Sequence, residues 1–240
     1  AASNRPAARP IDTAARRWNK AVMASSFGKR TDPYPALRRI AGGGAVAALG
    51  LYLIDAAIQA MRAPWQIDDF PEALYIKTEL LPWTFPLHMV TGGLVLLLIP
   101  AMILLRHRPH WHRRLGRVTV PVVLVAGVTA FPVALVAPVT PLSALGFTVQ
   151  GLLWLLFLGL GLRHVRRGNM AGHRAMMLLM AATTTGALFF RIYLALYALY
   201  GNPRHYQAFY ALDAWIAWAL PLAAMAIFLK RTGAFAANPR

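Results

Sequence analysis

The chain lacks cysteine altogether and has few acidic residues. The absence of cysteine excludes disulfides, thiolate metal sites, iron–sulfur clusters and thiol catalysis. Only 8 Asp and Glu residues stand against 25 Lys and Arg residues, and the acids are too dispersed for an obvious general acid/base pair. Nucleotide-binding glycine loops, nucleophile elbows and HExxH helices are also missing. Hydrolytic catalysis by a recognisable motif is therefore disfavoured.

What the chain does contain is apolar sequence. Of its 240 residues 58% are hydrophobic and only 14% charged, which does not fit a water-exposed surface. A membrane span needs about 20 mainly apolar residues. Six segments meet this requirement, namely 40–61, 84–105, 118–138, 143–162, 175–199 and 208–229. Because the apolar runs are continuous rather than alternating, they predict an all-α integral membrane bundle of six transmembrane helices and not a barrel.

The basic residues predict how this bundle is oriented. Of the 25 Lys and Arg residues, 21 lie in the N-terminal arm, in the loops after the second and fourth spans and at the C-terminus. Cytoplasmic loops carry such an excess, so both termini are predicted to be cytoplasmic. We expect a multi-pass protein of the bacterial inner membrane whose partner is the lipid bilayer. The net charge of +17 is then an orientation signal, and no nucleic acid is expected.

Three parts follow from this pattern: a basic N-terminal arm over 1–39, the transmembrane domain over 40–231 and a short tail over 232–240. In the arm, apolar residues recur at helical spacing at Ile11, Ala15, Trp18 and Val22, which is typical of an amphipathic helix on a membrane surface. A disordered basic tail is the alternative, because the arm also contains several prolines.

Charged groups inside spans are the first candidates for function, since each costs at least about 2.5 kcal/mol to insert. Three occur, Asp55, Arg191 and Asp213, and all fall in the predicted outer half of the membrane together with His88. We expect these four residues to form a polar cluster that binds a ligand or a proton. A salt bridge from Arg191 to Asp213 or Asp55, with a purely structural role, is the alternative.

The fifth span adds two residues to this picture. His173 precedes Arg191 by eighteen residues, which is five helical turns, and Thr184 precedes it by seven. A continuous helix would place the three side chains within about 20° of one face. That face is expected to point into the bundle.

Histidines at the cytoplasmic edge suggest a cofactor. The loop after the second span contains three of them, including His112, and His173 lies at the start of the fifth span. Two imidazoles at one depth on facing helices are what a b-type haem needs, and Arg113 and Arg174 follow them as partners for propionates. The alternative is that these residues anchor to lipid phosphates.

Between Leu87 and Leu194 the chain resembles a family of bacterial polytopic membrane proteins described as a predicted membrane domain of unknown function. The resemblance rests on an ordered set of motifs: Leu87-His88 with Gly92 and Gly93, Pro100, His112-Arg113-x-x-Gly116, Gly146-Phe147, Leu153-Trp154, Arg166-Arg167-Gly168, His173-Arg174-x-x-Met177 and Arg191-x-Tyr193-Leu194. It implies that His88, His112, His173 and Arg191 are signature polar positions. The chain departs from the family pattern at 99–103, where it lacks a glutamine, and this disfavours a polar ligand at mid-depth in the second span.

Three functions remain open on this basis. The first is binding of a redox cofactor or small apolar ligand, a b-type haem or a quinone-like molecule, in membrane electron transfer. His112 and His173 would be the axial ligands, and His88 with Arg191 the pocket for a headgroup. The second is a small-molecule or proton-coupled transporter that uses the polar cluster. The third is a structural or assembly subunit among other membrane subunits.

Overall fold

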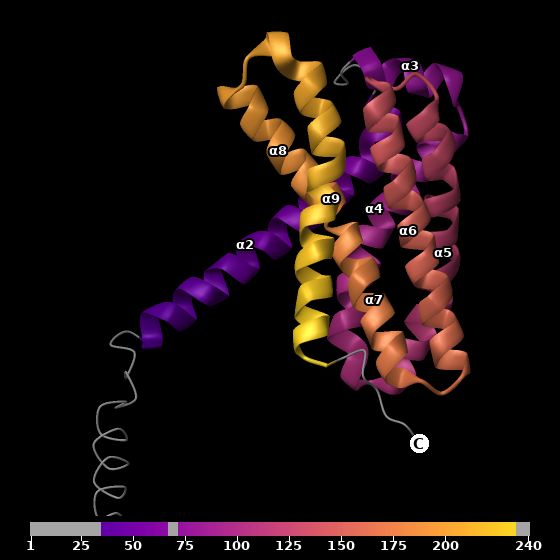
Figure 1. Ribbon diagram of the computed structural model, residues 1–240, viewed down its shortest axis with the longest axis vertical. Coiled ribbons are helices and arrows are strands. Elements are labelled where there is room, and N and C mark those ends of the chain that lie inside the picture. The colour runs from indigo at the N-terminus through magenta and orange to yellow at the C-terminus, as the bar shows by residue number, and fades with distance from the viewer. Residues whose placement is uncertain (1–34, 67–71, 234–240) are drawn as a thin grey trace, which may run out of the picture. The chain divides into compact units, whose positions relative to one another are not determined.

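The computed structural model describes residues 35–66 and 72–233, and these are helical almost throughout (Figure 1). The predicted amphipathic helix of the arm and most of the predicted tail lie outside the described residues. In chain order the elements are α2 (Pro35–Arg62), η1 (Ala63–Trp65), α3 (Glu72–Leu80), α4 (Thr84–Leu104), η3 (Leu105–His107), α5 (Pro109–Leu135), α6 (Pro141–Arg166), α7 (Met170–Thr184), α8 (Gly186–Tyr200), η4 (Pro203–His205) and α9 (Tyr206–Arg231).

The prediction of six spans is confirmed. Six helical segments are long and apolar enough to cross a membrane, namely Gly42–Trp65, Thr84–His107, Pro109–Leu135, Pro141–Arg166, Met170–Tyr200 and Pro203–Arg231. The third span begins at Pro109, well before the predicted residue 118. Proline is favourable at the first position of a helix, and the polar residues that follow it are part of the same helix. His110 and His112 are therefore helical, and the prediction that they lie in a loop is wrong.

The helix α2 belongs to two structural units that meet after Ala48. The described residues of the first unit form only the beginning of this helix, and Gly42–Ala48 are exposed. In the second unit, Ala56 and Ala57 of α2 are buried against Leu96 of α4 and Leu188 of α8. The second unit, residues 49–240, contains all of the remaining helices.

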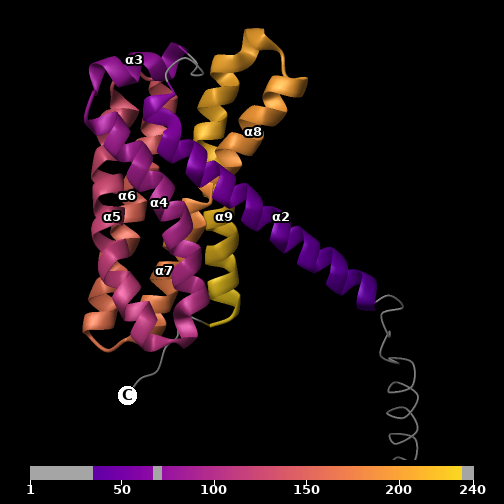
Figure 2. The ribbon, with the colours of Figure 1, turned by 180° about the vertical axis from the view of Figure 1, so that it is seen from behind.

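The core of this unit is made by four helices. Val95 and Ile99 of α4 pack with Val123 of α5, Leu158 of α6 and Met180 of α7. The helices α4, α5 and α6 lie side by side in both ribbon views (Figures 1 and 2). A second cluster joins α7 to α9 through Leu179 and Leu229.

Small residues bring α6 and α9 into close contact. A Cβ atom added at Gly146 of α6 would lie 2.8 Å from the backbone oxygen of Ala214 in α9, closer than any real Cβ contact. The Trp215 indole of α9 also donates to the backbone oxygen of Leu142, at 3.1 Å. Small residues at such points are what membrane helices use to approach one another.

The fifth span is interrupted, contrary to the prediction of one continuous helix. α7 ends at Thr184 and α8 begins at Gly186. The hydroxyls of Thr183, Thr184 and Thr185 donate back to carbonyls three or four residues earlier, a pattern that bends helices. Beyond the break α8 packs mainly on α9 (Figure 1).

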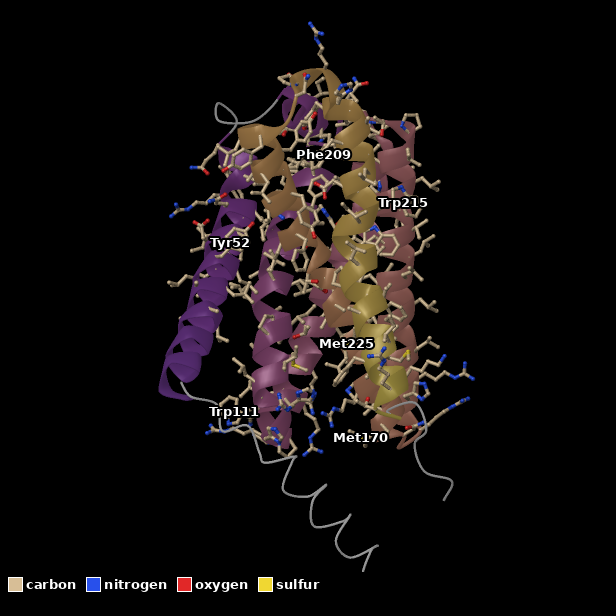
Figure 3. The ribbon with its side chains drawn as sticks, turned by 60° about the vertical axis from the view of Figure 1, so that its left-hand side comes forward. Tyr52, Trp111, Met170, Phe209, Trp215 and Met225 are labelled. Carbon is tan, nitrogen blue, oxygen red and sulfur yellow. The ribbon has the colours of Figure 1, made fainter. Side chains whose placement is uncertain are left out.

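The two ends of the unit differ in composition. We call the end with α3 and the turns at 136–140 and 201–205 the α3 end. The other end, with residues 105–117, 163–174 and 230–231, is the basic end, because the alternating directions of the spans gather the arginine-rich segments there. Figure 3 shows Trp111 and Met170 near the basic end and Phe209 near the α3 end.

Candidate functional site: a cavity between the helices

A cavity of about 300 Å³ lies in the half of the unit toward the α3 end. Residues from α4, α5, α6, α7, α8 and α9 line it, most of them apolar, including Phe85, Phe147 and Phe190. The lining also includes polar side chains, namely Lys77, His88, Ser143, Gln150, Trp154, Thr183, Thr184, Arg191 and Tyr210. Among the described lining residues there is no acid. The cavity lining is therefore mainly apolar, and its few charged side chains are cationic.

His88 reaches the cavity from the first turns of α4. Its Nδ1–H donates to the backbone oxygen of Ala126 in α5, at 3.0 Å, and the Thr129 hydroxyl lies 3.4 Å from the same nitrogen. The carbonyl acceptor requires that Nδ1 carries the proton, so Nε2 of a neutral ring has a free lone pair. His88 thus offers an acceptor that is held in a set orientation.

Arg191 reaches the cavity from the middle of α8. Its Nη1 donates to the backbone oxygen of Ala187, one turn earlier, at 2.7 Å. A guanidinium has five N–H donors. In the described part of the chain no carboxylate forms an ion pair with it, so the salt bridge to Asp213 or Asp55 considered from the sequence is not formed. Its donors are available to an acceptor in the cavity.

The two aspartates of the predicted cluster lie apart from this pair. Asp55 is exposed on α2 and accepts a hydrogen bond from the Gln59 side chain at 2.7 Å. Asp213 is completely buried in α9 and does not line the cavity. The structure thus brings His88, Arg191 and Thr184 to one cavity, but neither acid joins them.

Two polar residues to which the sequence pattern assigned no role in the site, Gln150 and Trp154, stabilise the cavity wall beside the helix break. The Gln150 amide of α6 donates to the backbone oxygen of Thr183 at 3.2 Å, and the Trp154 indole donates to the Thr184 hydroxyl at 2.8 Å. Thr183 and Thr184 are the last residues of α7. An amide in the middle of an apolar span is a signal that would have identified Gln150.

Lys77 was missed because it lies between two predicted spans. It is only 7% exposed, and its Nζ donates to the backbone oxygens of Val133 and Val136, both at 2.6 Å. Carbonyls in the last turn of a helix lack intrahelical donors, and a cation at this end is favourable. Burial lowers the pKa of Lys77. The residue therefore fixes α3 to the end of α5 at the cavity.

The histidines of the predicted haem pair do not line the cavity. Nδ1–H of His112 donates to the backbone oxygen of Met102 in α4 at 3.1 Å, and Nδ1–H of His173 donates to that of Gly161 in α6 at 2.9 Å. Each imidazole thus joins a different pair of helices at the basic end. In residues 35–66 and 72–233 no group of three or more His, Asp or Glu residues is placed to hold a metal ion.

The surroundings of His112 have the character of an anion-binding surface. His110, Arg113, Arg114 and Arg117 line a polar recess, and the Arg114 guanidinium lies 5.6 Å from the centre of the Trp111 ring. Arginine and tryptophan together are typical of the boundary between a bilayer and water. This favours anchoring to lipid phosphates for this segment.

The chain is thus a multi-pass helical membrane protein with a cavity inside its bundle. Residues 85–229 match the model of the family DUF2306, described as a predicted membrane protein, and the chain belongs to this family. The match includes α9, beyond the segment whose resemblance is visible from motifs alone. Neither a curated protein nor a solved structure gives a significant match.

Proposed function

We propose that this protein binds a small amphipathic molecule with a quinone-like headgroup in its cavity and serves membrane electron transfer. One observation carries the proposal: Arg191 and His88, from different helices, face one largely apolar cavity with hydrogen-bonding capacity that no described protein group uses. Sites for small molecules have this composition, a mainly apolar and aromatic lining with a few converging polar groups.

The chemistry of the two side chains suits both forms of such a headgroup. A quinone carbonyl is an acceptor, and the free N–H groups of Arg191 would donate to it. A quinol hydroxyl is a donor, and Nε2 of His88 would accept from it. The rings of Phe85, Phe147 and Phe190 would pack against the planar headgroup.

A b-type haem between His112 and His173 has less support. The two imidazoles bond to carbonyls on different helices, and neither lines the cavity. The geometry therefore favours the quinone-like ligand.

The orientation predicted from the basic residues supports a position of the cavity relative to the two faces of the membrane. With the basic end in the cytoplasm, as the positive-inside rule favours, both termini are cytoplasmic and the cavity lies in the outer half of a bacterial inner membrane.

The proposal is tested with a substitution whose larger side chain fills the cavity. Gly92 lines it, and a Cβ added there has nothing within 4 Å. Gly92→Leu is expected to abolish binding of a short-chain quinone, measured by quenching of tryptophan fluorescence, because Trp154 also lines the cavity. Gly159→Leu is the matched control, since Gly159 is exposed on α6 and also has open space.

The expected result is saturable binding to the unmodified protein and to Gly159→Leu, and none to Gly92→Leu. Quinone recovered by solvent extraction of protein purified from its native membrane would agree. Protein that contains no extractable quinone and does not bind the short-chain analogue would overturn the proposal, as would undiminished binding to Gly92→Leu.

A second candidate, transport of a small organic anion, has one specific observation in its favour. The break in the fifth span lies at the cavity, which Thr183, Thr184 and Gly186 all line. Interrupted helices at a polar site are a feature of secondary transporters, and the cationic lining favours an anion. Flux of a labelled organic anion into proteoliposomes should fall in Gly92→Leu but not in Gly159→Leu; equal flux in both would refute transport.

A further inference from the structure

Asp213 lies in the membrane-spanning part of α9, and no described residue is its hydrogen-bond partner. Its exposed fraction is 0%, and neither carboxyl oxygen has a hydrogen-bond partner among the described residues. A buried carboxylate that is ionised needs an opposite charge or several donors, because the surrounding protein and lipid do not solvate it. A protonated carboxyl carries no charge and avoids most of this penalty.

The position of Asp213 connects it to the cavity. Tyr210 and Ala217 both line the cavity, and they lie three residues before and four residues after Asp213 on the same helix. Residues at these spacings share one face of a helix. The Tyr210 ring packs edge-on against Phe190, with 5.2 Å between ring centres. The carboxyl group therefore lies behind the part of the cavity wall that α9 forms.

We propose that Asp213 is a proton-binding site behind the cavity wall. In this conformation the carboxyl group holds one proton. It releases the proton to water only when water or a cation reaches the carboxylate, and it takes one proton back when the wall closes. No bond other than O–H forms or breaks. This inference goes beyond the proposed function, since it does not depend on which molecule the cavity binds.

The ionisable groups on the elements packed against α9 do not neutralise Asp213. On α8, Arg191 donates to the backbone oxygen of Ala187 and lines the cavity. On η4, Arg204 and His205 are exposed. The described ionisable side chains of α6 and α7 lie at the basic end, and α9 itself contributes Tyr206 and Tyr210 nearby. No described cation forms an ion pair with the carboxylate.

The test is infrared spectroscopy of the full-length protein in lipid at neutral pH. The chain has 8 Asp and Glu residues, and a protonated carboxylic acid gives a carbonyl-stretch band separate from that of carboxylates. We expect one such band, shifted in deuterated water. Asp213→Asn should lose it, whereas Asp55→Asn should retain it, because Asp55 is exposed and hydrogen-bonded to Gln59.

Two results would overturn the inference. The first is an unmodified protein without a protonated-carboxyl band at neutral pH, a measurement that needs no variant to fold. The second is a band of equal intensity in Asp213→Asn. Quinone binding that persists in Asp213→Asn while the band disappears would support the two proposals separately. A band that remains in Asp213→Asn while quinone still binds would contradict the proton site and leave the ligand site intact.

Discussion

Three histidines make the same hydrogen bond at opposite ends of the bundle. Nδ1–H of His88, near the α3 end, and of His112 and His173, at the basic end, donate to a backbone carbonyl of a neighbouring helix at 2.9–3.1 Å. Only His88 of these three lines the cavity. The shared bond therefore joins helices at both ends, and the free space in front of the ring is what distinguishes the candidate site.

The packing of α7 and α8 against the other helices also differs between the two ends. At the basic end α7 lies against α6, and the atoms nearest to Gly161 belong to the flexible side chain of Met177. Toward the α3 end the chain leaves α7 at the break, and α8 packs mainly on α9. The cavity lies beside this break. An interrupted helix thus leaves room that a continuous one would fill.

The largest expected effect contrasts two glycines of α6. Gly146→Ala places a methyl group 2.8 Å from the backbone oxygen of Ala214, which has little room to move, so we expect a loss of about 1–3 kcal/mol in unfolding free energy. Gly161→Ala meets the movable end of Met177 and should change stability far less. Thermal unfolding in detergent measures both; equal losses would mean that the ends do not differ in this way.

Lys77→Met tests the bond that closes the α3 end. Loss of two charge-assisted hydrogen bonds to Val133 and Val136 should lower stability by about 1.5 kcal/mol or more. Lys230→Met, at the exposed end of α9, is the matched control and should have little effect. If both variants melt at the temperature of the unmodified protein, Lys77 does not stabilise this end.

The same lysine gives a pH dependence of defined sign. Because burial lowers the pKa of Lys77, the folded protein binds this proton less tightly than the unfolded chain. Stability therefore rises with pH between the folded pKa and the unfolded value of about 10.4. The melting temperature of the unmodified protein should increase relative to Lys77→Met as the pH rises from the folded pKa toward about 10. A constant or shrinking difference would contradict the burial of the charge.

His88→Ala and His112→Ala compare the two ends directly. A neutral hydrogen bond contributes about 0.5–1.5 kcal/mol, so His88→Ala should weaken binding of the quinol form, whose hydroxyl would donate to Nε2, roughly two- to tenfold. His112→Ala should leave binding unchanged, because His112 does not line the cavity. Titration by fluorescence quenching decides. Equal weakening by both substitutions would show that distance from the cavity does not matter.

The smallest effect is expected for Trp154→Phe. The substitution removes the indole donor to the Thr184 hydroxyl while keeping an aromatic ring. Side-chain hydrogen bonds between membrane helices average about 0.6 kcal/mol, so the melting temperature should fall only slightly. A drop as large as that of Gly146→Ala would mean that this bond maintains the helix break.

Prediction from sequence succeeded where the property is local. The six spans follow from the length and hydropathy of each segment. His88 and Arg191 were grouped by their similar depth, and Thr184 was assigned to the helix face of Arg191; all three line the cavity. Asp55 was placed in the cluster by depth as well, but it is exposed and does not line the cavity. Depth follows from position in the chain, whereas the direction of a side chain depends on how each helix is rotated against its neighbours.

The same reason explains the residues that were missed. Lys77 looked like a loop residue because its two acceptors, the backbone oxygens of Val133 and Val136, belong to a helix end far away in the chain. The hydroxyls of the three threonines before Gly186 donate to carbonyls of their own helix, and such bonds are compatible with a bend or with a straight helix. The sequence pattern does not show that α8 packs against α9.

By itself, the sequence determined that this is a six-span helical membrane protein of a recognisable family, with its basic residues gathered at one end. These properties follow from the hydropathy, the charge and the motifs of segments that are continuous in the chain. Only the tertiary structure decided that, among the described residues, no carboxylate lines the cavity of Arg191 and no donor reaches the buried Asp213. It also decided that His112 and His173 join separate helix pairs. Such contacts depend on the rotation and close approach of helices, which are set by interhelical packing of small residues and by the break after Thr184.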